Sequence, residues 1–351
     1  MDEEVLMGRS YIKVLQEHYE ELPFGGGKSP HIDVFDENDS VACEEFIRRV
    51  FALFGKEQEN QLLSLLGSVC EDRKRHIVYT FLLGVAIYKE SDFVRKRIDD
   101  ELNLYKDALA NQENEFEFVW FLICLFHDLA YPVEMKDEKA KNYETRDYQE
   151  LSKRMGDFCF PGLVAVPAIY YGMIDKYYDH KRQIYKDKSC DHGIIAGAYL
   201  YRDMCINRDK KRSMMRSNRF WKPELNRVYK FAASIVTCHN IWLQPHPNDV
   251  PEYKKRGMQP LIAPRRSRLI KIDIYPMFFL FCLVDSMEMS KRKEIALDKL
   301  KIDIKRDYIQ LDINELSRTS KYIVRYYFYA IDDWLTDVRE TENEVITISI
   351  K

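Results

Sequence analysis

The sequence predicts a mainly α-helical protein that ends in a small α+β unit. Over residues 38–290, apolar side chains recur every three or four positions in successive segments, as on one face of an amphipathic helix. After residue 291, the run LDKLKIDIKRDYIQLDI alternates apolar and polar residues, which is typical of strands. We therefore expect an N-terminal extension over 1–37, a helical core over 38–290 and a C-terminal α+β appendage over 291–351.

The bulk composition is that of a folded globule. Hydrophobic residues make up 46% of the 351 positions and charged residues 32%. The net charge of -3 gives the chain no overall attraction to nucleic acid or to an anionic membrane. Any contact with such partners would have to come from local patches.

Several helices can be placed from the apolar spacing. The first follows Asp39 or Ser40, either of which can cap a helix N-terminus. The segment at 160–178 carries two prolines and is expected to form a short helix with an irregular entry. The remaining expected helices are at 59–69, 74–88, 90–106, 113–129, about 192–206, 223–241, 274–290 and 317–338, with a last strand at 343–351.

The N-terminal extension ends in ELPFGGGKSPHIDVFDE, a glycine- and proline-rich loop. Its GGGKS run is not a phosphate-binding loop, because that motif needs a glycine five residues before Gly27 and Leu22 stands there.

The sequence also indicates a reducing, cytoplasmic location. None of the eight cysteines forms a C-x-x-C pair, and several lie within apolar runs. The acidic start MDEEVLMGRS is unlike a signal peptide. The longest apolar run, Tyr275 to Val284, is far shorter than the ~20 residues that span a bilayer, so no membrane partner is expected.

Histidine and aspartate residues at the edges of these apolar helices are the candidate functional residues. Burying such groups without partners costs roughly 1–3 kcal/mol each. A shared metal centre would satisfy them together, since imidazole and carboxylate suit first-row divalent metals. A single histidine of this kind is more often a hydrogen-bonded core residue, but here the order His, His-Asp, His, His, Asp runs over separate helices. The six residues are His76, His127, Asp128, His192, His239 and Asp285.

These residues resemble the pattern of the HD superfamily, the helical metal-dependent phosphohydrolases named for their His-Asp doublet. The resemblance covers roughly 70–290 and is carried by HDLAYP, DHGII, CHN and LVDSME. It implies an HD-domain helical bundle in which His76, His127, Asp128 and Asp285 bind one metal. It also implies that His192 and His239 bind a second metal, while Asp128 bridges both ions and helps to hold the attacking hydroxide.

Departures from the family pattern argue against three of the family's substrate classes but do not identify the substrate. Tyr131 stands where the branch that cleaves cyclic di-GMP carries a lysine. LAYPVE lacks the acidic pair of members that hydrolyse guanosine tetraphosphate. No histidine occurs between Asp128 and His180, where the nucleotide triphosphohydrolases usually have more.

Substrate-binding candidates lie near the doublet and in two basic stretches at 210–222 and 254–268. Tyr131 and Glu134 follow the doublet, and Asn240 beside His239 could anchor an imidazole. Asp191 beside His192 is as well explained as a helix N-cap. The basic stretches could grip phosphates, although charged runs are usually solvated loops. Their candidate residues are Lys211, Arg212 and Arg265.

We therefore expect a phosphohydrolase or phosphodiesterase that uses two divalent metal ions (Mn, Fe, Mg, Ni, Co or Zn) and metal-activated hydroxide. Its expected partner is a phosphorylated small molecule or nucleotide, with nucleic acid as an alternative. One rival is a di-iron oxygenase of the kind that resembles myo-inositol oxygenase, since it uses the same six ligands. The other is a metal-binding sensor or scaffold that acts through the appendage.

Overall fold

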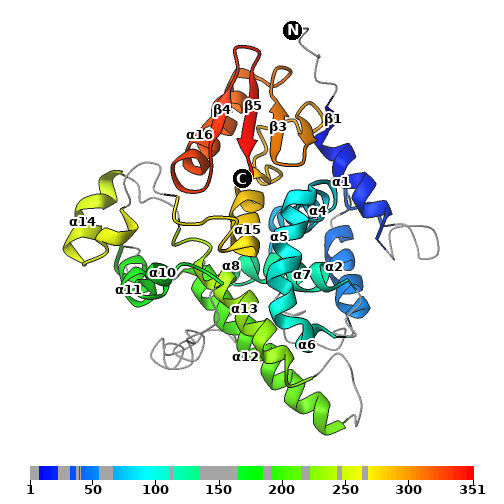
Figure 1. The fold of residues 1–351 in the computed structure, drawn as a ribbon, viewed down its shortest axis with the longest axis vertical. Helices are drawn as coiled ribbons and strands as arrows, with labels where there is room; N and C mark the ends of the chain where they lie inside the picture. The colour runs from blue at the N-terminus through cyan, green and yellow to red at the C-terminus, as the bar shows by residue number, and fades with distance from the viewer. Residues whose placement is uncertain are drawn as a thin grey trace.

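The computed structural model describes residues 8–22, 32–36, 39, 41–54, 66–110, 114–134, 165–184, 191–214, 222–242, 247–262 and 268–351. For 133, 182–184, 206–214, 247 and 329 it describes the backbone alone. The protein is mainly helical, with a small antiparallel sheet formed largely by the C-terminal part of the chain. In Figure 1 the sheet lies at one end of the molecule and helices α12 and α13 extend to the other.

The helices of the first half are α1 (Tyr11–Glu20), α2 (Ala42–Leu53), α4 (Glu71–Glu90), α5 (Asp92–Leu102), α6 (Lys106–Leu109), α7 (Glu115–Leu129) and α8 (Tyr131–Glu134). Those of the second half are α10 (Ala168–Tyr171), α11 (Ile174–Ile184), α12 (His192–Met214), α13 (Leu225–Cys238), α14 (Val250–Lys255), α15 (Pro276–Met287) and α16 (Arg318–Trp334). Short 3-10 turns occupy Asn103–Tyr105, Pro247–Asp249 and Gln259–Leu261.

The sheet contains β1 (Arg9–Ser10), β2 (Lys301–Ile304), β3 (Tyr308–Asp312), β4 (Val338–Glu340) and β5 (Val345–Ser349) in the order β1-β2-β3-β5-β4. All neighbouring strands are antiparallel. In β2 and β3 the residues alternate between buried and half-buried, which is the pattern that the sequence predicted. Helix α16 contacts β4 and also α15, so it joins the sheet to the helical part.

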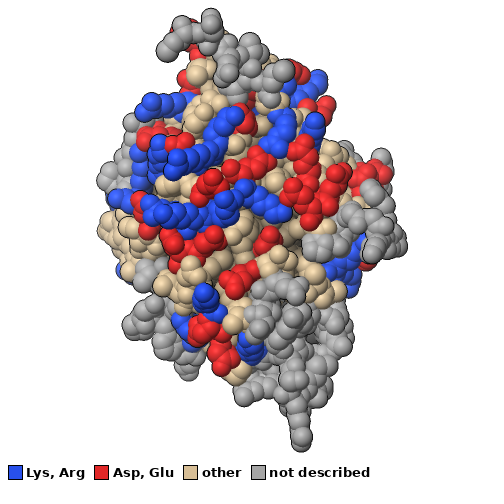
Figure 2. Space-filling model, turned by 45° about the vertical axis from the view of Figure 1, so that its right-hand side comes forward, with Lys and Arg blue, Asp and Glu red and all other residues tan. Residues whose placement is uncertain are grey.

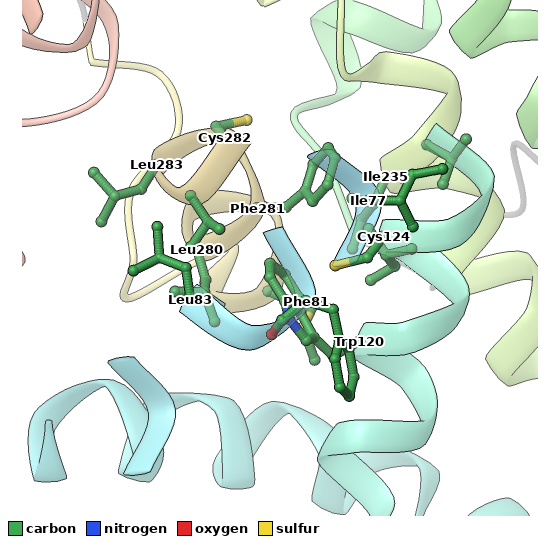
Figure 3. Packing of buried hydrophobic residues seen from close by; sticks show 14 of the residues in the cluster. Ile77, Phe81, Leu83, Trp120, Cys124, Ile235, Leu280, Phe281, Cys282 and Leu283 are labelled. Carbon is green, nitrogen blue, oxygen red and sulfur yellow. The ribbon is translucent and has the colours of Figure 1, made fainter. Parts of the chain in front are cut away.

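The core of the helical part lies where α4, α7 and α15 meet. Figure 3 shows side chains from these helices and from α13 pointing into one interior, among them Ile77, Phe81, Trp120, Ile235 and Phe281. Helices α4 and α7 pack closely at Gly84, where an added Cβ would lie 2.2 Å from the Trp120 ring. The Trp120 indole also donates to the carbonyl oxygen of Phe81 (3.0 Å), which satisfies its buried N–H group.

Most expected elements are found, with ends that differ by a few residues. The expected helix at 59–69 lies largely outside the described residues. Asp39 accepts hydrogen bonds from the N–H groups of Val41 and Ala42 (both 3.1 Å), just ahead of α2. Strand β4 was not predicted.

Residues 9–20, in the expected N-terminal extension, form a short strand and a helix that were not predicted. Arg9 and Ser10 pair with Lys301 and Ile302 of β2, and α1 packs against α4 with Tyr11, Val14 and Leu15 fully buried. Strand β1 could not be predicted from local patterns, because a two-residue strand has no periodicity of its own.

Charged side chains of both signs are interleaved on the surface. On the face drawn in Figure 2, Lys and Arg alternate with Asp and Glu, so no single-sign patch dominates it. This agrees with the small net charge of -3. Among the helices that the structure describes, none is both long and apolar enough to cross a membrane.

Candidate metal centre

The six residues singled out from the sequence come together, although they belong to separate helices. His76 lies in the N-terminal half of α4, and His127 and Asp128 lie in the last turn of α7. His192 is the first residue of α12, His239 directly follows α13, and Asp285 lies in the last turn of α15. Contacts of α7 with α4, α12 and α13, and of α15 with α4, bring these positions to one place.

The first group that could hold a metal ion contains His76, His127 and Asp128. Each offers one ligand atom, and these atoms lie within 4.8 Å of one another. Asp285 borders the same group, with its Oδ1 2.9 Å from His76 Nε2 and 3.9 Å from His127 Nε2. Two imidazoles and two carboxylates thus face a common point.

The second group contains Asp128, His192 and His239, with ligand atoms again within 4.8 Å of one another. His192 Nε2 lies 3.3 Å from Asp128 Oδ1 and 3.2 Å from His239 Nε2. Gly193 makes room for this arrangement, because a Cβ there would lie 2.5 Å from the His239 ring. Asp128 belongs to both groups, as the bridging role predicted for it requires.

The outer nitrogen of every histidine in the centre is held by an acceptor. His127 Nδ1 donates to the Cys124 carbonyl oxygen (2.6 Å) and His239 Nδ1 to that of Val236 (2.7 Å). The Nδ1 atoms of the other two meet carboxylates: His76 contacts Glu288, and His192 contacts Glu134. With Nδ1 as the donor, each ring presents the Nε2 lone pair to the centre, which is the tautomer that a metal ligand needs.

The surroundings of His127 Nε2 indicate whether this centre suits a cation. Among the described residues, the buried His127 Nε2 has no hydrogen-bond partner. Such a group is costly unless a partner satisfies it, and a divalent cation would satisfy it together with the two facing carboxylates. Phe281 closes one side with its ring centroid 5.3 Å from that of His127, which keeps this side apolar. The residues present therefore fit metal ions.

The imidazoles of the centre titrate in different directions, although His76, His127 and His239 are buried and His192 is only 14% exposed. Burial lowers the pKa of His127 to about 3 and that of His239 to about 4. Burial also disfavours the charged form of His192, but Asp128 and Glu134 outweigh it and raise the His192 pKa to about 10. Burial disfavours the ionised carboxyls too, yet His127, His192 and Arg73 hold the pKa of Asp128 well below its usual range.

Two cations border the centre that the sequence analysis did not single out. Arg73 Nη1 donates to Asp128 Oδ2 (2.8 Å), and its guanidinium lies 4.2 Å from the centroid of the Tyr131 ring. Lys291 Nζ lies 3.1 Å from Asp285 Oδ1 and 3.1 Å from His76 Nε2. Arg73 precedes His76 by three residues on the same helix, so the two side chains lie on one face of α4.

The other candidates have mixed outcomes. Tyr131 lies at the centre, with its ring centroid 5.4 Å from that of His192. Asn240 Nδ2 donates to Asp191 Oδ2 (3.1 Å) and lies 3.4 Å from His192 Nε2, while Asp191 caps α12 by accepting from the N–H of Ile194 (2.9 Å). The side chains of Lys211, Arg212 and Arg265 lie outside the described residues.

Comparisons with protein-family models, with curated proteins and with solved structures each find no match to this chain.

Proposed function

We propose that this protein is a metal-dependent phosphohydrolase or phosphodiesterase of the HD type, with two divalent metal ions in its active site. The observation that carries the proposal is the shared orientation of the four histidines. Each Nδ1 is held by an acceptor, so the four Nε2 atoms converge on Asp128 and Asp285. His76, His127, Asp128 and Asp285 would hold one ion, and Asp128, His192 and His239 the other.

The charges around the centre support an anionic substrate. Carboxylates outnumber the cations Arg73 and Lys291 there, and two divalent ions would reverse the sign of the local charge. Both cations remain partly accessible, with 23% of the Arg73 side chain and 16% of the Lys291 side chain exposed. A phosphoester, as found in nucleotides and nucleic acids, offers the oxygens that such donors bind.

The protein's own residues would then orient the reaction. Bound divalent ions supply Lewis acidity and a nucleophile at neutral pH. Asp128 connects the two metal groups, because its Oδ2 faces His127 and its Oδ1 faces His192. Arg73 and Lys291 bind the phosphate, and Tyr131, stacked on Arg73, fixes the guanidinium.

The test separates hydrolase from oxygenase. We expect Mn²⁺-loaded protein under argon to release nitrophenol from bis-(p-nitrophenyl) phosphate, because hydrolysis needs neither oxygen nor a redox change. Asp128→Ala should reduce the rate to that of the buffer. Asp107→Ala is the control, since Asp107 is an exposed residue paired with Arg227 outside the centre.

A protein that reacts only with iron and only in air would instead be a di-iron oxygenase. A protein that binds the ions but turns over neither kind of substrate would be a metal-dependent sensor or scaffold.

A further inference from the structure

The partners of the four histidines follow a pattern that repeats in both metal groups. In each group one imidazole is backed by a backbone carbonyl and the other by a glutamate. In the first group the carbonyl of Cys124 holds His127, and Glu288 holds His76. In the second the carbonyl of Val236 holds His239, and Glu134 holds His192.

Glu288 is an unusual residue to bury. Its side chain is 0% exposed, as is that of His76. It follows α15 directly, and Ser290 donates to it twice, from its backbone N–H (2.7 Å) and from its hydroxyl (2.9 Å). A buried carboxylate is expensive unless it is paired and hydrogen-bonded, and it adds little stability that an apolar residue could not supply. Its contact with His76 explains why a glutamate is buried at this position.

Glu134 occupies the corresponding place on the other side. It ends the short helix α8 and reaches the first residue of α12, so the contact joins two elements that are far apart in the sequence. Its side chain is 22% exposed and that of His192 is 14% exposed. A change at this position therefore disturbs the packing less than one at Glu288.

We infer that Glu134 and Glu288 are positioning residues, each of which sets the affinity of one metal group independently of the other; this inference rests on the proposed function. A carboxylate on Nδ1 fixes the tautomer and the angle of the ring and increases the electron density at Nε2. The backbone carbonyls behind His127 and His239 orient those rings but carry no charge. The glutamates are thus where side-chain chemistry tunes the strength of each group.

The experiment measures Mn²⁺ binding to the full-length chain by calorimetry, with the bound metal counted by elemental analysis. We expect two ions in the wild type. Glu134→Gln and Glu288→Gln should each weaken one of the two binding events about 10–100-fold and leave the other unchanged. Glu101→Gln is the matched control: Glu101 is a buried glutamate that accepts from the N–H of Met277 (2.9 Å).

Double variants show which group each glutamate serves. In a His192→Ala background, Glu134→Gln should cause no further loss of affinity, because the ring that it orients is gone. In a His76→Ala background it should still weaken the remaining ion. Glu288→Gln should behave in the opposite way. Glu134→Asp, which keeps the charge, should recover part of the affinity.

The outcomes are distinguishable. A wild type that binds two ions, with affinities that Glu134→Gln leaves unchanged, overturns the positioning role and leaves the proposed function standing. A wild type that binds no Mn²⁺ overturns the proposed function itself. If Glu288→Gln fails to fold, as judged by circular dichroism, the partly exposed Glu134 carries the test.

Discussion

At the scale of single residues, the centre shows how contact partners decide the charge of neighbouring imidazoles. The side chains of His127 and His192 are 1% and 14% exposed, yet the pKa of the first falls to about 3 and that of the second rises to about 10. Burial favours the neutral imidazole in both. The difference is that carboxylates lie close to both ring nitrogens of His192, whereas His127 Nδ1 meets a neutral carbonyl oxygen and its Nε2 lies 3.8 and 3.9 Å from the nearest carboxylate oxygens.

The first expected outcome concerns His192. His192→Ala removes one of three candidate ligands of the second group, so the protein should bind one Mn²⁺ per chain and lose most of its activity. His180→Gln, in α11, should still bind two. Elemental analysis after gel filtration gives the stoichiometry, and a variant that retains both ions and full turnover would refute the second site.

The second expected outcome concerns Glu101, which lies outside the centre. Burial raises its pKa to about 8, although the N–H of Met277 partly offsets this. The folded state therefore binds a proton more tightly than the unfolded state, and its stability falls as pH rises from about 4.5 to about 8. Glu101→Gln should remove this slope and stabilise the protein by up to about 5 kcal/mol above pH 8. Urea unfolding at several pH values measures it, and parallel curves for both proteins would contradict it.

The six candidate ligands could be predicted because each is a histidine or aspartate at the edge of an apolar helical segment. Arg73, Lys291 and Glu288 could not be selected in the same way. Arg73 lies in the run DRKRH and Lys291 in SKRK, where several neighbouring charges are equally plausible. Only the packing of α4 against α7 and α15 decides which charge faces the centre.

At the scale of elements, the contact between α4 and α7 depends on the absence of a side chain at Gly84. A Cβ there would lie 2.2 Å from the buried Trp120 ring, which is itself held by its hydrogen bond to Phe81. This glycine therefore lets α7 approach closely enough to place His127 and Asp128 opposite His76.

Gly84→Ala should consequently destabilise the protein by about 1–3 kcal/mol, because overpacking outweighs the gain in helix propensity. Gly172→Ala is the control: it has helical dihedral angles, and its nearest neighbour would lie 3.8 Å from the new Cβ. That variant should be as stable as the wild type or slightly more so. Thermal unfolding compares the two, and equal melting temperatures would disprove the steric argument.

Strand β1 and helix α1 show where prediction from the sequence ends. The apolar residues Tyr11, Val14 and Leu15 have helical spacing in the sequence. The strand partner of Arg9, however, is Ile302, which lies far along the chain. Local patterns identify helices such as α7 from their own residues. They do not identify a two-residue strand whose existence depends on pairing across the whole sequence.

At the scale of the whole molecule, the candidate centre connects distant parts of the chain. His76 and Asp285 are 209 residues apart, and the other ligands lie on helices between them. An ion bound by these residues therefore ties together helices that the backbone connects only through long intervening segments. Ligands that bind the folded state alone stabilise it according to their concentration relative to Kd.

Mn²⁺ should accordingly raise Tm, by several degrees at concentrations of about 100 times Kd, where the stabilisation is roughly 2.7 kcal/mol per site.

This rise in Tm should become larger as the pH increases. Because the metal-free pKa of His192 is about 10, the ring is protonated at neutral pH and must release a proton to bind the ion. In the metal-free protein this raised pKa stabilises the folded state fully at pH values below 6.5, the pKa of His192 in the unfolded chain. That stabilisation is lost as the pH rises towards 10. Metal binding has the opposite trend, with affinity at this site increasing about tenfold per pH unit. The difference in Tm between Mn²⁺-loaded and chelator-treated protein should therefore grow from about pH 5 to about pH 8. A difference in Tm that shrinks over this range would mean that metal binding does not displace a proton from His192.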